Sequence, residues 1–334
     1  MSFKILKLKL DKMLFVPLKI FTYIKKLKIE DVLKAEIITQ LCRVNTLSTI
    51  KIAGSGHLGT SFSAMDLFVW ISHFVINKKK KDFNRDIFFS SKGHDVPAFY
   101  NVLFSLGIIK FNKILRLRRL NGLDGHPDVR INGIEFNTGS LGMGISKAKG
   151  ISWAKKYLKK KGLSIVITGD GEFQEGQIYE SLQTTSAQNI KNLLVIMDHN
   201  KIQSSQFVKD IVNIEPLVQK IKSFGWHVER CNGNSMVSLS KTLKRILKKT
   251  SKPKFLIADT IKGKGISFIE HPNYMKKNKR YNWHSGAPNN IEFDLMQQEL
   301  KDKIENLLKE NKILIYPFIN LSEKNKNFNS IEIH

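Results

Sequence analysis

One glycine-rich and acidic octet, residues 169–176, constrains what this chain can fold into. It reads Gly-Asp-Gly-Glu-Phe-Gln-Glu-Gly and follows an apolar, β-branched run at 165–168 that is typical of a buried strand. A helical segment to about residue 189 comes next, and a second apolar run occupies 193–197. A strand, a helix and a strand in this order predict two parallel strands joined by a right-handed crossover.

Polar side chains follow both of these strands. Asp170 comes directly after the first, and Asn200 follows the second within Asp-His-Asn-Lys-Ile. Because open α/β sheets bind ligands at the carboxyl ends of their strands, we expect the two side chains to meet. Together with a backbone carbonyl near Ile202, they offer hard oxygen ligands for Mg²⁺ or Ca²⁺, with phosphate oxygens and water completing the shell. The octet alone also fits an ordinary glycine bend, and the residues leave that alternative open.

Three of the nine histidines directly follow a glycine, namely His57, His94 and His126. A glycine lets the backbone turn sharply, so each ring can point into a cleft. Imidazoles suit hydrogen bonding to a diphosphate or substrate hydroxyl, and proton transfer near neutral pH. We expect these three and His284, which lies in another loop, to share one site. The glycine-rich stretch 137–144 opens a helix and can cradle phosphate oxygens.

Composition excludes several classes of function. The chain has 334 residues and a net charge of +26, but the excess is mostly scattered lysine, and its basic runs lack interleaved aromatics. We therefore predict no nucleic-acid partner. No apolar run approaches the roughly 18 residues of a membrane span, so we expect no membrane partner. The two cysteines lie far apart and in no metal spacing, which favours a reducing, cytoplasmic compartment.

Alternating strand and helix patterns over residues 30–290 predict one α/β domain, with a parallel sheet and helices on both faces. Helices are expected at 30–53, 114–120 and 211–224, among others. The basic residues 1–29 are expected to form a loosely ordered extension, with a transit peptide as the alternative. Residues 291–334 are expected to be a polar helix and a tail.

Taken together, the motifs resemble the transketolase family over residues 30–290, and they occur in family order. The matching segments are Ser55–Gly59, Ser91–His94, Gly125–Asp128, Thr138–Gly142, Gly169–Gly176 and His284 in His-Ser-Gly-Ala-Pro. The resemblance implies the pyrophosphate-type fold that binds thiamin diphosphate.

The resemblance also implies roles for individual residues. The metal would be held by Asp170, Asn200 and the Ile202 carbonyl. Thiamin diphosphate would be contacted by His94, Gly139, Ser140, Leu141, Gly171, Asn200 and His284. The substrate would meet His57, His126 and His284, with His57 and His284 assisting proton movements and His126 binding the donor's terminal hydroxyl. Glu175 would lie near a subunit interface and support the relay that activates the cofactor.

The same resemblance implies a partner chain. Full-length family members carry a pyrimidine-binding domain, with the glutamate that tautomerises the cofactor, and a C-terminal domain. We expect this chain to be the N-terminal subunit of a split transketolase, transferring a two-carbon ketol unit between sugar phosphates only with that partner, in an α2β2 assembly. Other interpretations are a subunit of a 2-oxo acid dehydrogenase, a deoxyxylulose phosphate synthase-like protein, or a non-catalytic basic binding paralogue.

Three positions depart from the family pattern. Leu58 replaces a usual proline, Met143 a frequent glutamine, and Asp95 a small residue. Asp95 matters most, because a carboxylate beside a diphosphate is repulsive unless it points away.

Overall fold

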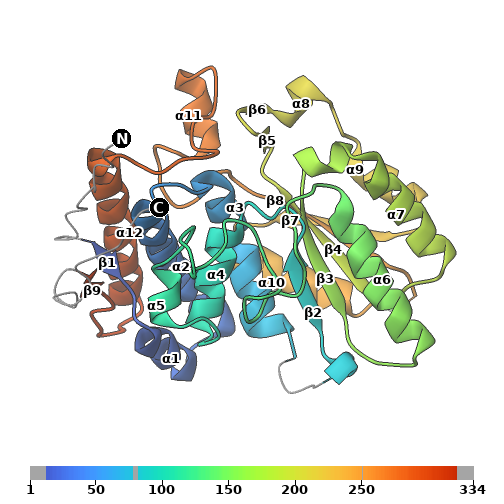
Figure 1. Cartoon of the computed structure of the whole chain (residues 1–334), viewed down its shortest axis with the longest axis horizontal. Helices are drawn as coiled ribbons and strands as arrows, with labels where there is room; N and C mark the ends of the chain where they lie inside the picture. The colour runs from blue at the N-terminus through green and yellow to red at the C-terminus, as the bar shows by residue number, and fades with distance from the viewer. Residues whose placement is uncertain (1–12, 78–81, 250, 322–334) are drawn as a thin grey trace.

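A parallel sheet of five strands forms the centre of the molecule. The computed structural model describes residues 13–77, 82–249 and 251–321. The strands are β2 (Ile87–Ser90), β3 (Ser164–Gly169), β4 (Leu193–His199), β7 (His227–Asn232) and β8 (Lys254–Asp259). Their order is β2-β3-β4-β8-β7 (Figure 1). The strand order therefore reverses beside β4, and such a switch point is where open α/β sheets bind ligands.

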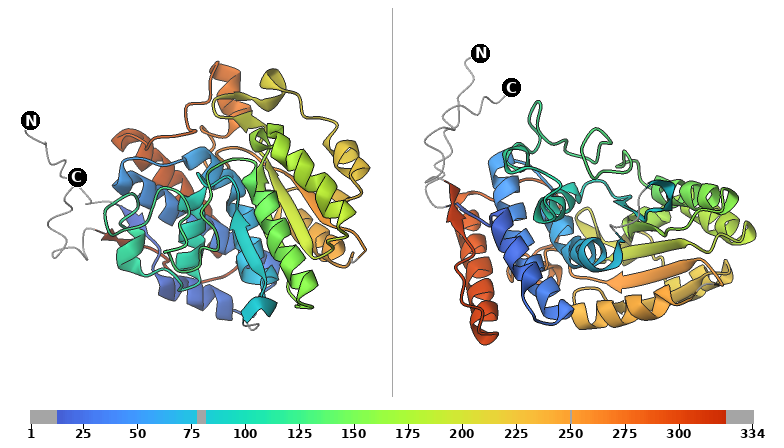
Figure 2. Two further views of the ribbon diagram at one scale, coloured as in Figure 1. Left: turned by 45° about the vertical axis from the view of Figure 1, so that its right-hand side comes forward. Right: turned by 90° about the horizontal axis from the view of Figure 1, so that it is seen from below.

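Helices cover both faces of the sheet, as predicted. On one face lie α2 (Asp31–Ala53), α3 (Leu58–Trp70), α4 (Val96–Ser105), α10 (Met236–Leu247) and α12 (Asn290–Glu310). On the other lie α6 (Met143–Tyr157), α7 (Gly176–Ala187) and α9 (Leu217–Ser223). Figure 2 shows α10 on the face of the sheet opposite to α6 and α7.

Each inner strand contributes side chains to two hydrophobic cores, because successive side chains point to opposite faces of the sheet. Ile165 and Ile167 of β3 belong to the larger core under α2 and α3, whereas Val166 belongs to the smaller core under α6 and α7. This explains why the sequence of β3 reads as a continuous apolar run rather than as an alternating pattern.

The N-terminal segment differs from the prediction. Residues 13–29 are packed, not loosely ordered: β1 (Leu14–Phe15) pairs antiparallel with β9 (Ile319–Asn320), and α1 (Leu18–Lys26) buries Ile20, Phe21 and Ile24. The apolar residues of this basic segment recur at helical spacing, and that face docks on the larger core. Residues 1–12 lie outside the described part of the chain.

Two predicted helices are wrong in extent, although the helix expected at 30–53 is confirmed as α2. Only α5 (Phe111–Ile114) is helical in the first region, because Arg118 and Asn121 adopt φ angles of 55° and 57° and the chain turns back. In the second region, α8 (Val208–Ile211) ends before α9 begins after Pro216. A proline disfavours helical geometry at the residue before it and has no N–H to donate.

Smaller elements surround the carboxyl edge of the sheet. A short hairpin of β5 (Ile202–Gln203) and β6 (Gln206–Phe207) follows β4, and α11 (His271–Lys277) follows β8. A 3₁₀ turn at Gly171–Gln174 follows β3. Sequence patterns did not predict these, since each is too short to show a period.

Candidate active site

The expectation that Asp170 and Asn200 meet at one edge of the sheet is confirmed. One carboxylate oxygen of Asp170 accepts the N–H of Lys201 at 2.5 Å, and the other accepts the N–H of Gly171 at 2.8 Å. Asn200 Oδ1 accepts the N–H of Ile202 at 3.2 Å within the same turn. The register of β3 on β4 places these strand ends level, with Gly169 opposite Asp198.

A lysine reaches the third expected metal ligand. Lys262 Nζ donates to the Ile202 carbonyl at 2.9 Å and to the Ser204 carbonyl at 3.2 Å. Burial lowers the pKa of Lys262 to about 7, against the opposing effect of the Asp170 carboxylate. Burial likewise raises the pKa of Asp170. Acidic, amide and carbonyl oxygens thus converge with one cationic side chain.

A network of buried ion pairs and hydrogen bonds connects Asn200 to Lys92 and Asp95 through Asp198. Lys92 Nζ donates to Asp198 at 2.5 Å and lies 3.2 Å from Asp95. Asp198 also accepts from Ser63 Oγ at 2.7 Å and from Asn200 Nδ2 at 3.1 Å. The unusual Asp95 therefore pairs with a buried lysine and accepts a hydrogen bond from Ser90 Oγ, and this pairing offsets its negative charge.

The four predicted site histidines surround one point. The ring centroid of His57 lies 5.2 Å from that of His94, 5.3 Å from His284 and 6.4 Å from His126. The His94 and His284 centroids are 5.4 Å apart. The chain separates these residues widely, so their convergence is a product of the fold.

Two glycines allow the loops that hold these histidines to approach closely. Gly93 has a φ of 70°, and a Cβ there would lie 2.7 Å from the Cα of Gly139. Gly139 has a φ of 129°, and its Cβ would lie 2.7 Å from His126 Cδ2. The His94 loop, the 137–144 loop and His126 are thereby stacked at distances that exclude larger residues.

The histidine cluster is held in its neutral form. Burial lowers the pKa of His57 to about 4, with Arg118 adding to the effect, and burial lowers the pKa of His284 to about 3, with Lys262 adding. Burial also lowers the pKa of His94 and His126. His94 Nδ1 lies 2.9 Å from the Lys92 carbonyl, which leaves Nε2 toward the cluster. At neutral pH these rings can each accept and donate one hydrogen bond.

The N-terminus of α6 differs from the expected phosphate cradle. Its first N–H groups are already bonded: Gly142 donates to Glu172 at 2.9 Å, and Gly144 donates to Ser91 Oγ at 3.0 Å. Glu172 also accepts from Gly169 N–H at 3.0 Å and from Ser91 Oγ. The loop ahead of the helix, with Gly139 half-buried and Ser140 and Leu141 exposed, remains open for a ligand.

Glu175 contacts the loop that precedes α6. It is exposed, directly precedes α7 and lies against Gly142, where an added Cβ would be 2.7 Å from Glu175 Cβ. Its predicted role at a subunit interface stays a prediction.

Sequence reasoning assigned no role to Lys262, Lys92 and Arg118, which all face the site. Arg118 Nη1 donates to Ser55 Oγ at 3.2 Å, and its other terminal nitrogen lies 3.5 Å from His57 Nδ1. Lys262 could have been found from its place just after strand β8, at the ligand-binding edge. Arg118 could not, because its segment reads as a basic helix.

Comparison with known proteins decides the family. The model of "Transketolase, thiamine diphosphate binding domain" matches residues 34–285. The chain belongs to the transketolase family. It is the N-terminal, thiamin diphosphate-binding part of such an enzyme, as the sequence motifs predicted.

The chain spans nearly the whole length of two curated relatives, each named as one subunit of an apulose-4-phosphate transketolase. It is 32% identical over 280 residues to the subunit from Phocaeicola vulgatus, covering 83% of this chain and 97% of that one. It is 37% identical over 253 residues to the subunit of the same name from Actinobacillus succinogenes, covering 74% and 88%.

Solved transketolases share the fold. The structure from Leishmania mexicana superposes with a TM-score of 0.69 at 22% identity, over 85% of this chain and 46% of that one. The chain therefore spans less than half the length of this solved relative, whereas it spans most of the two apulose-4-phosphate transketolase subunits.

Two kinds of feature are absent from the described residues. In residues 13–77, 82–249 and 251–321, no three His, Cys, Asp or Glu side chains form a group that could hold a metal ion. A cation at this edge would therefore depend on amide and carbonyl oxygens as well as on Asp170. Across the same residues, every helix is too short or too polar to cross a bilayer.

Proposed function

We propose that this chain is the cofactor-binding subunit of a two-chain transketolase that moves a two-carbon ketol unit between sugar phosphates. The observation that supports this most is the convergence of four neutral histidines beside Asp170 and Asn200. The two relatives that it nearly spans are named as subunits, which agrees with a division of the enzyme between chains.

The donor set fits a hard divalent cation. Asp170 is buried, and its carboxylate has lone pairs left after the N–H groups of Gly171 and Lys201 are bonded. Asn200 Oδ1 and the Ile202 carbonyl add two neutral oxygens, and a diphosphate would supply the rest of the shell. With Mg²⁺ at the Ile202 carbonyl, we expect the Lys262 ammonium to turn away, because two cations on one carbonyl oxygen repel each other.

Thiamin diphosphate, when bound, supplies the carbon nucleophile and the electron sink for ketol transfer. The chain's own residues would hold and orient it. Gly139, Ser140, Leu141 and Gly171 would contact its diphosphate. His94, which is fixed by its bond to the Lys92 carbonyl, would contact the cofactor as well.

The histidines would bind the substrate and assist its proton transfers. His57 and His284 are neutral at pH 7, so each would assist proton movements by accepting a hydrogen bond from a substrate hydroxyl. His126 is the most exposed of the four and would bind the donor's terminal hydroxyl at the mouth of the site.

We propose that a second polypeptide completes the site. It would carry the glutamate that activates the cofactor's aminopyrimidine, in an α2β2 assembly in the cytoplasm. The exposed Leu141 and Glu175 at the edge of the cofactor loop support a covering partner here.

Reconstitution tests the proposal. The purified chain, a C-terminal transketolase subunit, thiamin diphosphate and Mg²⁺ are assayed for ketol transfer from ketose phosphates, separately and together. We expect activity only in the mixture, with His57→Ala and His126→Ala mixtures strongly impaired. Substantial transfer by this chain alone would refute the need for a partner. Decarboxylation of 2-oxo acids without ketol transfer would instead favour another class of thiamin enzyme.

A further inference from the structure

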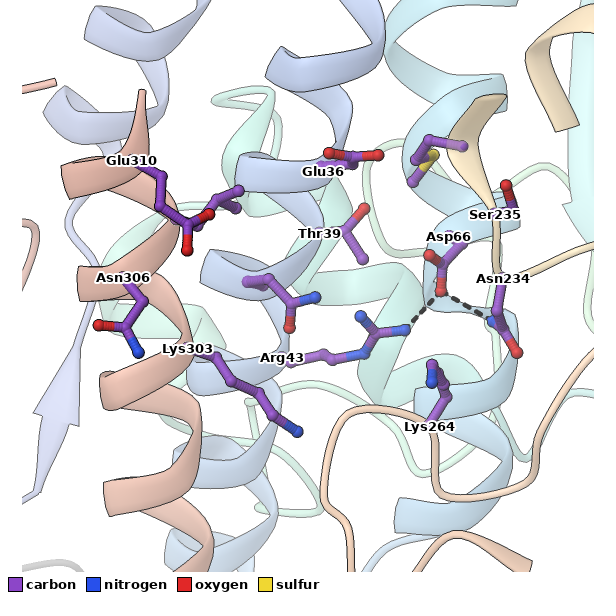
Figure 3. Close-up of a pocket in the computed structure, with 13 residues that line it drawn as sticks. Glu36, Thr39, Arg43, Asp66, Asn234, Ser235, Lys264, Lys303, Asn306 and Glu310 are labelled. Atoms are coloured by element: carbon purple, nitrogen blue, oxygen red, sulfur yellow. Dashed lines mark hydrogen bonds and ion pairs between the residues drawn. The ribbon is translucent and has the colours of Figure 1, made fainter. Parts of the chain in front are cut away.

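A polar pocket of about 540 Å³ is lined by residues of α2, α3 and α12, and by none of the four site histidines. It is formed where polar faces of α2 and α12 oppose one another. The lining residues recur at helical spacing on each of these helices. They are Glu36, Gln40 and Arg43 on α2, and Lys303, Asn306 and Glu310 on α12. Figure 3 shows the pocket spread over three helices, with Lys303 and Glu310 on α12 and with Arg43 extending from α2 to Asp66 on α3.

Buried polar atoms in this pocket lack partners. Arg43 and Thr39 are each 1% exposed, yet Arg43 Nε and Thr39 Oγ1 have no hydrogen bond to any described residue, and neither has Gln40 Oε1. Unpaired buried polar atoms cost stability, so such a group is normally satisfied by a water or a ligand. The pocket therefore presents three unmet hydrogen-bonding atoms, two of which can accept.

The charges of the pocket are unevenly paired. Arg43 is matched by Asp66, Lys264 by Glu270 at 3.1 Å, and Lys303 by Glu299 at 2.7 Å. Glu36 and Glu310 form no ion pair with any described residue. Their carboxylates lie at the end of the pocket away from Lys264 and Lys303 (Figure 3). The lining as a whole holds three acidic and three basic side chains, so the unpaired negative charge is confined to the end formed by Glu36 and Glu310.

We propose that this pocket binds a small organic cation that carries hydroxyl groups, of the chemical class of the amino sugars. Its ammonium would lie between Glu36 and Glu310. Its hydroxyls would donate to Gln40 Oε1 and accept from Arg43 Nε. A cavity of this size is within the range that holds small ligands.

The pocket is independent of the cofactor site, so the proposal does not rest on the proposed transketolase function. Calorimetric titration of the full chain without thiamin diphosphate, at low ionic strength and with the amine protonated, compares three probes that share one sugar ring. These are glucosamine, N-acetylglucosamine, which lacks the charge, and glucose, which lacks the amine.

We expect saturable one-to-one binding of glucosamine, at least about tenfold tighter than that of the other two probes, because a charge-assisted bond to a partly buried carboxylate is lost in each. Equal binding of all three, or no saturable binding of glucosamine, would overturn the proposal.

Matched variants locate the binding. Glu36→Gln and Glu310→Gln should each weaken glucosamine binding by about three- to tenfold. Glu305→Gln changes the same helix, but Glu305 pairs with Lys301 outside the pocket and should leave binding unchanged. Unfolding free energies of the variants verify folding, and the exposed Glu310 keeps the test decisive if the half-buried Glu36 position is sensitive. Unchanged binding in both pocket variants would place glucosamine elsewhere and refute the proposal.

Discussion

Glu172 and Glu175 lie three residues apart but have different roles, since the first stabilises the fold and the second is expected to support catalysis. Exchanging each for glutamine tests the two roles separately. Glu172 is buried, and its carboxylate accepts hydrogen bonds from Gly142 N–H, Gly169 N–H and Ser91 Oγ. It thereby ties the ends of β2 and β3 to the start of α6. Glu175 is exposed and makes no side-chain hydrogen bond to the described residues.

The cost of Glu172→Gln follows from these bonds. A glutamine amide has one oxygen, which can serve the Gly142 and Ser91 donors, and its NH₂ group would then face the Gly169 N–H. One buried donor is left unpaired and two charge-assisted bonds become neutral, while the desolvation of a buried charge is relieved. These effects sum to a loss of about 1–3 kcal/mol in the free energy of unfolding. Glu175→Gln should change that free energy by less than about 0.5 kcal/mol.

Urea unfolding of the purified variants, followed by circular dichroism, measures both values. In reconstitution with a partner, we expect Glu175→Gln to lower ketol transfer without lowering stability. If Glu172→Gln were as stable as the unmodified chain, the assignment of Glu172 as the link between these three segments would be refuted.

Three further predictions follow from the site. The free energy of unfolding should fall as the pH drops from about 6.5 to about 4. The pKa of His57 is lowered to about 4, so this ring stays neutral in the folded chain while the unfolded chain takes up a proton. In an acid titration, the free energy of unfolding of His57→Asn should therefore depend less steeply on pH. Gly93→Ala should cost about 2 kcal/mol or more, measured by urea unfolding, since its φ is 70° and its Cβ would lie 2.7 Å from Gly139. Asp95→Ala should cost about 1–3 kcal/mol, since buried Lys92 loses one of two carboxylates; a stable Asp95→Ala chain that binds thiamin diphosphate more tightly would show instead that Asp95 faces the diphosphate.

The sequence predicted the architecture because the main segments are long and strongly patterned. The strand before Asp170 is rich in β-branched residues and is buried along its whole length, so its continuous pattern was enough to place it. The placement of Asp170 and Asn200 at one edge of the sheet followed from parallel strand topology alone. The glycine–histidine pairs indicated one shared site because each is a turn with a functional side chain attached.

Other features needed the fold. Arg118 lies beside His57 because two residues with positive φ reverse a segment that reads as a helix. Lys262 reaches the Ile202 carbonyl across strands that are 60 residues apart in the chain. The capping of α6 by Glu172 was hidden as well, because a glycine loop before a helix looks the same whether an internal carboxylate or a phosphate meets it.

We propose that Asp170 and Asn200 hold a divalent cation that anchors the diphosphate of the cofactor. Calorimetric titration of the chain with thiamin diphosphate, in Mg²⁺ and in EDTA, tests it directly, with Asp170→Asn as the matched variant. We predict that removing the metal weakens binding by at least about tenfold, and that Asp170→Asn in Mg²⁺ binds as weakly as the unmodified chain in EDTA. Equal affinity in Mg²⁺ and EDTA, or full affinity in Asp170→Asn, would show that no metal ion held by Asp170 anchors the diphosphate.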